Sequence, residues 1–188
     1  MQQHTVQIRQ ATTSDAPFIA QAVAMAIGDE NAMKSYCGKD YITLFTKIAE
    51  SEHSQYSYLN TLIAETDGNI VGAIIGYDGA KLNELRATTY SIIYNELGRT
   101  PSIPDETEAG EFYIDTLAVL PQHRGTGIGR KLITAIRDKA FTAGHSHVGL
   151  IVDFDNPQAE SLYTSLGFAR VGTKTFLEHK MWHMQAYK

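Results

Sequence analysis

The stretch LAVLPQHRGTGIGRKLI, residues 117–133, decides how we expect this chain to fold. It begins with apolar and β-branched residues that suit a buried strand. Pro121 ends that strand, because proline has no N–H to give to a sheet. Gly125, Gly127 and Gly129 follow, and apolar residues then recur four apart, as on one face of a helix. These apolar residues are Ile128, Leu132, Ile136 and Ala140. The stretch therefore predicts a strand, a glycine-rich loop and a helix, in that order.

The glycine-rich loop has the properties of an anion site. Its glycines leave the main chain bare, so a ligand can rest directly on backbone N–H groups. The loop also opens a helix, where the first N–H groups lack intrahelical partners and the helix dipole is positive. Phosphate is the anion that we expect at such a place. A turn that binds nothing is the alternative, because short glycine motifs also arise by chance.

Three phosphate-binding patterns compete for this loop. A P-loop requires Gly-Lys-Ser/Thr after a four-residue gap, which the loop lacks. A dinucleotide fingerprint requires GxGxxG, whereas the loop reads GxGxG and we expect no βαβ unit at this place. The third pattern, Q/R-x-x-G-x-G/A, is matched by Gln122, Gly125 and Gly127. The loop thereby resembles the pyrophosphate-binding signature of the GNAT superfamily of N-acetyltransferases.

Composition limits the class of protein. The chain has 188 residues, of which 43% are hydrophobic, so we expect a single domain spanning residues 1–188. A net charge of -5 argues against a nucleic acid or an anionic membrane as the main partner. The single cysteine, Cys37, excludes an internal disulfide and fits a reducing compartment. With no apolar leader or membrane span in view, we expect a cytoplasmic protein. His145 and His147 have no third ligand in view, so we expect no metal.

The order of periodic segments predicts a mixed α/β fold with a central sheet of about seven strands flanked by helices. Alternating or continuously apolar runs predict strands at residues 5–9, 58–66, 69–77, 111–120, 148–154, 168–173 and 180–186. Helical spacing predicts helices at residues 15–27, 41–48, 128–144 and 157–166. Asp67-Gly68 joins two of the strands as an antiparallel hairpin.

Residues 78–110 form an insertion in this pattern. Leu82, Leu85, Ile92, Ile93 and Leu97 predict one or two helices, and residues 99–110 read as a loop rich in proline and acidic residues. We interpret the insertion as a lid or wall that shapes the acceptor site. A packing decoration of the core is an equally good interpretation.

A second motif follows the glycine loop at the distance that one strand and one helix require. The run Asn156-x-x-Ala159-x-x-Leu162-Tyr163-x-x-x-Gly167-Phe168 resembles the second GNAT signature. The start IRQAT, residues 8–12, with Asp15 is similar to the family's opening. The resemblance covers nearly the whole chain except residues 78–110. It implies the GNAT acyl-CoA N-acyltransferase fold.

The resemblance also implies acetyl-CoA as the donor, a primary amine as the acceptor, and a set of site residues. The strand edge at Leu117 and Val119 would pair with the pantetheine arm, and the loop N–H groups would hold the pyrophosphate. Asn156 and Tyr163 would face the thiol end, where Tyr163 protonates the leaving thiolate. The residues implied in cofactor binding are Leu117, Ala118, Val119, Arg124, Gly125, Thr126, Gly127, Ile128, Gly129, Arg130, Asn156, Ala159 and Tyr163.

The chemistry of acetyl transfer asks for the same parts. A tetrahedral oxyanion needs fixed N–H donors, which a splayed strand with a bulge near Ala118 would leave free. A phenol can protonate a thiolate at neutral pH, and a carboxylate or water can deprotonate the amine. Asp115 is our candidate base, with Glu111 or water as alternatives. Alternation places Asp115, Glu111, Tyr113 and Leu117 on one face.

The acceptor stays open at this level. The acidic loop at residues 105–111 favours a cationic acceptor, such as a small amine, a polyamine or an amino sugar. A protein N-terminus or a lysine side chain is the main rival. A non-catalytic acyl-CoA-binding sensor is the alternative from another class, and the motif spacing disfavours ATP or NAD as ligand. We expect direct attack in a ternary complex, because no Cys or Ser nucleophile with a neighbouring base is evident. Since dimers are common in the family, a homodimer is a possible assembly.

Overall fold

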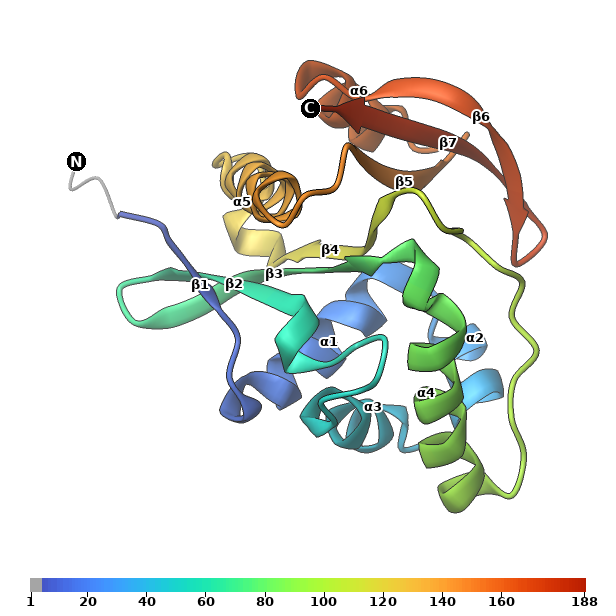
Figure 1. Cartoon of the computed structure of the whole chain (residues 1–188). Helices are drawn as coiled ribbons and strands as arrows, with labels where there is room; N and C mark the ends of the chain where they lie inside the picture. The colour runs from blue at the N-terminus through green and yellow to red at the C-terminus, as the bar shows by residue number, and fades with distance from the viewer. Residues whose placement is uncertain (1–4) are drawn as a thin grey trace.

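A computed structural model describes residues 5–188, so the polar start at residues 1–4 lies outside the described residues. Over this described range the chain forms a seven-stranded mixed sheet of order β1-β2-β3-β4-β5-β7-β6 (Figure 1). The strands are β1 Gln7–Gln10, β2 Thr61–Thr66, β3 Asn69–Asp78, β4 Phe112–Val119, β5 His147–Asp153, β6 Ala169–Phe176 and β7 His179–Tyr187. β4 and β5 are parallel, and the other neighbouring pairs are antiparallel. The predicted fold class is confirmed.

Helices cover both faces of the sheet. They are α1 Ala16–Ile27, α2 Glu30–Cys37, α3 Tyr41–Glu50, α4 Leu82–Leu97, α5 Ile128–Thr142 and α6 Pro157–Ser165. Figure 1 shows α1 and α3 on the opposite side of the sheet from α5. One core cluster joins α1 and α3 to the sheet, and a second joins α5, with side chains of α6 packed against it. We call these two sides the α1 face and the α5 face.

Helix α5, the end of α1 and the β2–β3 hairpin form through the residues that predicted them. The residues Ile128, Leu132, Ile136 and Ala140 are all buried on one side of α5. Gly28 ends α1 in the left-handed conformation, at φ 69°, which glycine adopts without strain. In the β2–β3 hairpin, Thr66 pairs with Asn69, and Asp67 and Gly68 both have positive φ, as a two-residue turn of type I′ requires.

Three features of the structure differ from the sequence prediction. Helix α2 was not predicted, because only Met33 and Cys37 in it are buried and two apolar positions give little periodicity. Residues Tyr58–Asn60 form a 3₁₀ turn, so β2 starts at Thr61. The glycine loop also lies inside a βαβ unit, since α5 connects the parallel strands β4 and β5. The expectation of no βαβ unit there was wrong, and only the glycine spacing still distinguishes the loop from a dinucleotide fingerprint.

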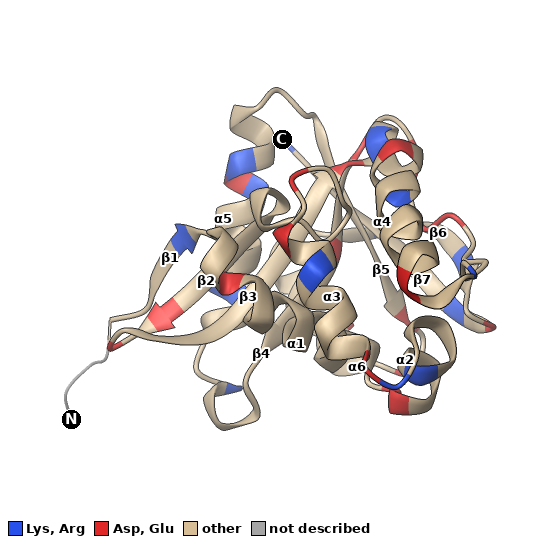
Figure 2. Cartoon of the chain, turned by 90° about the horizontal axis from the view of Figure 1, so that it is seen from below, with Lys and Arg blue, Asp and Glu red and all other residues tan. Residues whose placement is uncertain are grey.

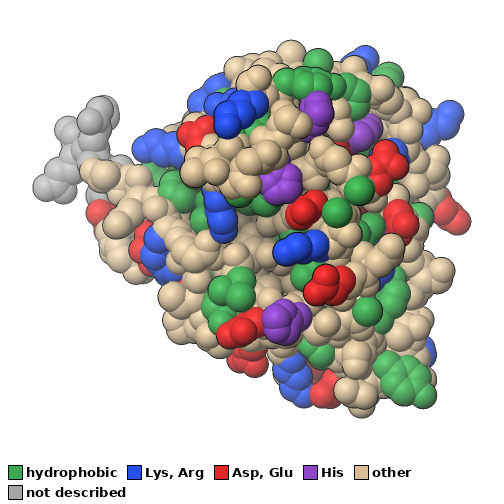
Figure 3. All heavy atoms as spheres, in the orientation of Figure 1, with side chains coloured by type: hydrophobic (Ala, Val, Ile, Leu, Met, Phe, Trp, Pro, Cys, Tyr) green, Lys and Arg blue, Asp and Glu red, His purple; other side chains and the backbone are tan. Residues whose placement is uncertain are grey.

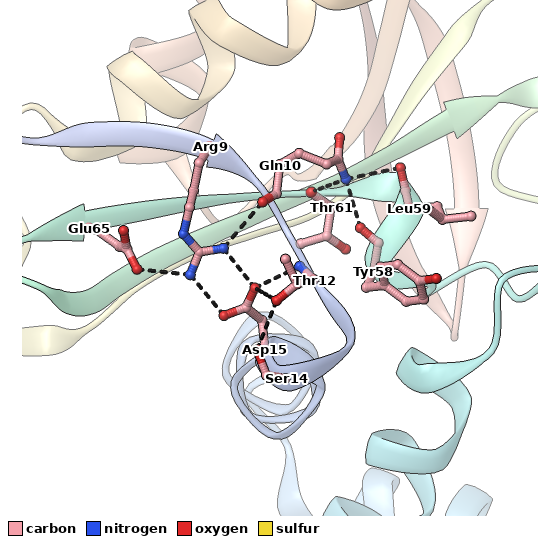
Figure 4. Close-up of polar contacts among 9 residues, drawn as sticks. All are labelled: Arg9, Gln10, Thr12, Ser14, Asp15, Tyr58, Leu59, Thr61 and Glu65. Carbon is pink, nitrogen blue, oxygen red and sulfur yellow. Dashed lines mark hydrogen bonds and ion pairs between the residues drawn. The ribbon is translucent and has the colours of Figure 1, made fainter.

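Arg9 ties the start of the fold together (Figure 4). Its guanidinium donates to both carboxylate oxygens of Asp15, over 2.7 and 2.9 Å, and to Glu65 Oε1 over 2.8 Å. These contacts join β1, the turn before α1, and β2. The paired guanidinium lowers the pKa of Asp15 to about 2, with a backbone hydrogen bond from Thr12 in support.

Strands β4 and β5 separate soon after they meet. Within the described residues they pair at two positions, Phe112 with Val148 and Tyr113 with Gly149. β4 stays paired with β3 as far as Val119, whereas β5 continues beside β7. The edge of β4 from Ile114 to Val119 therefore has no strand partner on its β5 side. We call this gap between β4 and β5 the splay.

Candidate active site

A β-bulge in β4 lies at the start of the splay. Ile75 of β3 faces Thr116, but the next residue, Gly76, faces Ile114, so Asp115 is an extra residue on β4. The expected bulge near Ala118 was therefore misplaced by three residues. A bulge interrupts alternation: Ile114 packs in the core of the α5 face, whereas Ala118 packs in that of the α1 face.

The bulge also changes which side chains share a face. Tyr113 packs with Tyr77 on the α1 face, and Asp115 bonds to the same tyrosine. Leu117 packs against the core of the α5 face instead. Alternation therefore placed Tyr113 and Asp115 together correctly, but its placement of Leu117 with them was wrong. The cause is the one extra residue, which resets the pleat.

The glycine loop presents a row of free N–H groups. No described residue accepts a hydrogen bond from the backbone N–H groups of residues 125–130. Gly125 and Gly127 have φ of 75° and 85°, and a Cβ on either would meet nothing within 4 Å. The loop is thus open to an incoming group, and Gly127 caps α5, so the N–H groups converge on the positive end of the helix. These residues fit a pyrophosphate.

Side chains around the loop have local partners. Arg124 donates through Nε to the carbonyl of Val119 over 3.1 Å, and Thr126 Oγ1 donates to the carbonyl of His123 over 2.6 Å. Leu120 N–H donates to Val71 of β3, so by alternation the backbone groups of Val119 point into the splay. Arg124 therefore lies at the mouth of the splay, beside the edge expected to hold the pantetheine arm.

Helix α6 is fixed against the start of α5. Arg130 Nη2 donates to Ser165 Oγ over 2.8 Å, and Gly129 lies close to Leu162. Asn156 caps α6, because its Oδ1 accepts from Ala159 N–H over 3.1 Å. The structure thus brings the two signature motifs side by side, as a shared ligand would require.

Tyr163 has a hydroxyl available for chemistry. Its ring packs edge-on against Phe168 at 5.9 Å, in the core of the α5 face. No described residue forms a hydrogen bond with its hydroxyl. Burial raises the pKa of Tyr163 to about 12, so the phenol keeps its proton at neutral pH. This is the protonation state that a general acid needs.

The carboxylate of Glu111 takes part in a buried hydrogen-bond network. Its carboxylate accepts hydrogen bonds from His183 over 2.8 Å, from Gln185 over 2.7 Å and from Thr107 over 2.7 Å. It is 2% exposed, and it occupies the space where Gly149 lacks a side chain. Although burial opposes ionisation, these donors lower the pKa of Glu111. Such a group joins the start of β4 to β7, and both of its oxygens already accept hydrogen bonds.

Asp115 has a different environment. It is half-buried and accepts hydrogen bonds from Tyr77 OH over 2.8 Å and from Thr116 Oγ1 over 2.9 Å. Burial raises the pKa of Asp115 despite these donors. A carboxylate with raised proton affinity at the bulge is suited to accept a proton.

Sequence reasoning missed a second buried carboxylate. Glu106, 5% exposed, contacts Tyr77 and forms an ion pair with Arg86 of α4 at 3.0 Å. Gln55 reaches the same tyrosine from the segment after α3. The acidic loop at residues 105–111 contained Glu106, but nothing in its sequence distinguishes a buried glutamate from the exposed Glu108. The partner Arg86 lies twenty positions earlier, beyond any local pattern.

Charged residues also lie on the sides of the molecule drawn in Figures 2 and 3. On the side covered by α1 and α3, acidic and basic positions are interspersed (Figure 2). In the orientation of Figure 1, charged and histidine side chains gather near the middle of the surface (Figure 3). A hollow of about 360 Å³ lies at the end of β3. Its lining includes His53, Lys81, Lys139 and His145, far along the sheet from the glycine loop.

Among the described residues there is neither a cluster of metal ligands nor a helix that could span a membrane. In residues 5–188, no His, Cys, Asp and Glu side chains are grouped as metal ligands would be. None of the helices in that range is long and apolar enough to cross a membrane.

The candidate acid and base approach the splay from opposite faces of the sheet. Tyr163 packs on the α5 face, together with the glycine loop, whereas Asp115 lies on the α1 face with Tyr77. The free edge of β4 runs between them. One group can therefore act on the donor and the other on the acceptor.

Comparison with known proteins gives matches along most of the chain. The profile described as "Acetyltransferase (GNAT) family" matches residues 29–168. A solved structure described as an acetyltransferase is 30% identical, with a TM-score of 0.83 over 96% of this chain and 98% of that chain. An N-acetyltransferase from Staphylococcus aureus Mu50 is 27% identical, with a TM-score of 0.82 over 96% of this chain and 100% of that chain.

Curated relatives match over shorter regions. The N-alpha-acetyltransferase RimI of Mycobacterium tuberculosis is 35% identical over 103 residues, 55% of this chain and 50% of the relative. Mycothiol acetyltransferase of Renibacterium salmoninarum is 40% identical over 70 residues, 37% of this chain and 20% of the relative. The chain thus spans half or less of the length of these curated relatives.

Proposed function

Because the chain belongs to the GNAT family of acetyltransferases, we propose that it transfers the acetyl group of acetyl-CoA to a primary amine. The observation that carries this proposal is the row of free N–H groups at residues 125–130, beside an unpaired strand edge. The loop fits the pyrophosphate and the edge fits an amide-containing arm, which together describe CoA.

The donor is held by the residues that the two motifs supply. In the proposal, residues 125–130 bind the pyrophosphate through backbone N–H groups, and Arg124 and Arg130 add positive charge beside it. Leu117 and Val119 offer backbone groups to the pantetheine arm, and Ala118 lies between them. Asn156 and Ala159 form the cap that orients α6, which carries Tyr163.

The reaction proceeds in one displacement. The amine nitrogen attacks the thioester carbonyl carbon, while Asp115 takes the proton that the ammonium must lose. N–H groups on the free edge of β4 stabilise the tetrahedral oxyanion. The C–S bond then breaks, and Tyr163 gives its proton to the leaving thiolate. Attack is direct, because Cys37 is buried and burial raises its pKa to about 11, which leaves it a poor nucleophile.

We propose a small cationic amine, a polyamine or an amino sugar as the acceptor. The support is the half-buried carboxyl group of Asp115, with the buried Glu106 close by, on the face of the splay opposite the donor loop. A protein N-terminus is the rival acceptor, since one relative is named as an N-alpha-acetyltransferase.

Two measurements test this function. Calorimetry should detect selective binding of acetyl-CoA over ATP and NAD, with CoA as a reference ligand. Release of the CoA thiol should then depend on an amine from a panel of small amines, polyamines, amino sugars and short peptides. Absence of acetyl-CoA binding contradicts the proposal. Binding without thiol release for any amine in the panel supports an acyl-CoA sensor instead.

A further inference from the structure

Two carboxyl groups from different segments meet at one hydroxyl. Tyr77 OH lies 2.8 Å from Asp115 Oδ2 and 3.4 Å from Glu106 Oε1. Asp115 is the bulge residue of β4, whereas Glu106 comes from the loop between α4 and β4. Gln55 Nε2 also donates to the tyrosine hydroxyl over 3.2 Å and, over a longer 3.5 Å, to Glu106 Oε1, so a third segment holds both oxygens in place.

The contacts of Tyr77 with two carboxyl groups require one proton more than the phenol supplies. A phenol has one proton and cannot donate to two carboxylates at once. With both carboxyl groups ionised, the longer contact, between Tyr77 and Glu106, would set two acceptors against each other. A proton on Glu106 resolves the conflict: Glu106 then donates to the Tyr77 oxygen, and Tyr77 donates to Asp115.

The surroundings of the two carboxyl groups decide which one keeps the proton. Burial raises the pKa of Asp115, but the two hydroxyls that donate to it oppose this and favour its ionised form. Burial and the charge of Asp115 raise the pKa of Glu106 to about 7, although the guanidinium of Arg86 opposes this. The other titratable groups that face the pair are Tyr56, Tyr77, Tyr90, Asp105 and Tyr113. Among them, the tyrosines at 56, 77, 90 and 113 have raised pKa values and stay neutral near pH 7.

We propose that Glu106 and Asp115 hold one proton between them across Tyr77, and that Glu106 keeps it, so that Asp115 stays ionised to receive the proton of the acceptor amine. The last clause rests on the proposed function, whereas the shared proton is a property of the free protein. Glu106 and Arg86 are positioning residues, because they act through Asp115.

This proposal gives the insertion a defined task. Residues 78–110 bring both Arg86, on α4, and Glu106, on the following loop, to the α1 face of the splay. Arg86 also pairs with Asp105 and donates to the carbonyls of Ile103 and Pro104, which fixes the path of the loop. In this proposal the insertion controls the protonation of Asp115, which lies outside it on β4.

The first test is a direct titration of the free protein by NMR of ¹³C-labelled carboxyl groups. Wild type should show one carboxyl that titrates near pH 7, and Glu106→Gln should lose it. Glu108→Gln, which removes an exposed carboxyl two residues away, is the matched control and should retain it. Where Glu106→Gln does not fold, Asp115→Asn serves: it removes the neighbouring charge, so the titration of Glu106 should move to lower pH.

Two results would overturn the shared proton. One is a wild type in which every carboxyl titrates below pH 5. The other is a titration near pH 7 that persists in Glu106→Gln. Neither depends on acetyl transfer, so a failure of the proposed function leaves this test intact.

The second test asks whether the shared proton serves Asp115. Glutamine copies only the protonated form of Glu106, so the ratio of kcat/KM between Glu106→Gln and wild type should change from pH 6 to pH 8. A merely structural role would give a ratio independent of pH, and that result would overturn the link to Asp115. The Glu108→Gln ratio should stay constant over the same range.

Discussion

At the scale of single residues, Tyr163 offers the clearest test of the mechanism. We expect Tyr163→Phe to lower kcat by about a hundredfold, which is within the usual worth of a general acid, while the Kd for acetyl-CoA stays nearly unchanged. The ring still packs against Phe168, so the loss comes from the hydroxyl alone. Steady-state thiol release and calorimetry measure the two quantities. Tyr94→Phe, which alters an exposed tyrosine on α4, is the control.

Wild-type turnover of Tyr163→Phe across the amine panel would remove this residue from the mechanism. A parallel loss of kcat and of acetyl-CoA affinity would assign it to binding instead.

Substitution of Gly127 by valine tests whether the glycine loop binds the pyrophosphate. A valine there must adopt φ near 85°, and its side chain would point into the open space above the N–H groups. We expect acetyl-CoA to bind at least about tenfold more weakly, equivalent to about 1.4 kcal/mol. Gly144, with φ of 99° and equally open space, lies at the other end of α5. Gly144→Val therefore imposes similar strain without crowding the loop.

Calorimetry on the two variants separates these effects. Equal loss of affinity in both would mean that backbone strain, and not access to the loop, causes the loss. Unchanged affinity in Gly127→Val would mean that the pyrophosphate is held elsewhere.

Sequence could predict the residues that act through the backbone and could name Tyr163 and Asp115 as candidates, but it could not predict the tertiary contacts that these side chains make. The loop at residues 125–130 follows from glycine and helix chemistry alone. The Glu106–Tyr77–Asp115 cluster depends on a bulge and on a loop far from β4 in sequence. Glu111 and Asp115 look alike in sequence, yet the carboxylate of Glu111 accepts hydrogen bonds from three side chains and that of Asp115 from two.

At the scale of secondary-structure elements, the ion pair between Arg9 and Asp15 joins β1 to the start of α1. The folded-state pKa of Asp15, about 2, is below its ordinary value of 3.8. The contribution of the ionised Asp15 carboxylate to the free energy of unfolding is therefore fully present above about pH 4 and is lost as the pH falls through 2. The shift corresponds to about 2 kcal/mol of stability at neutral pH.

We accordingly expect Asp15→Asn to lower the free energy of unfolding by about 2 kcal/mol at pH 7, and by progressively less between pH 4 and pH 2. Urea unfolding at several pH values measures this difference. Asp29→Asn, which changes an exposed helix cap of α2, is a control that leaves the Arg9 network intact. A difference that stays constant down to pH 2 would contradict the assignment to ionised Asp15.

The contact between Glu111 and Gly149 fixes β4 to β5 just before they separate. A Cβ at position 149 would lie 1.8 Å from Glu111 Oε2, so one of the two groups must move. We expect Gly149→Ala to cost about 1–3 kcal/mol, the usual cost of overpacking a core. In a Glu111→Ala background the same substitution should cost clearly less, because the obstacle is gone.

Thermal unfolding of the two single variants and the double variant gives this coupling. Additive costs would mean that Gly149 is required for another reason. The elements themselves could be predicted from periodicity. This contact joins Glu111, the residue before β4, to Gly149 of β5, which pairs with Tyr113, and it has no local sequence signal.

At the scale of the whole molecule, the two cores share one sheet. We therefore propose that residues 1–188 fold as one domain, insertion included, because α4 packs on α3 and its following loop leads into β4. A single calorimetric transition is the expected result. Acetyl-CoA at a hundred times its Kd should add about 2.7 kcal/mol and raise Tm. Separate transitions, with only one moved by acetyl-CoA, would contradict the one-domain proposal.

The splay between β4 and β5 has a consequence for substrate access. It is a gap through the sheet, with Tyr163 on one side and Asp115 on the other. If the proposed function holds, acetyl-CoA and the acceptor amine enter from opposite faces of the sheet, and the acetyl group is transferred in the splay. Neither substrate would then block the entry of the other, so steric obstruction would not impose an order of substrate binding.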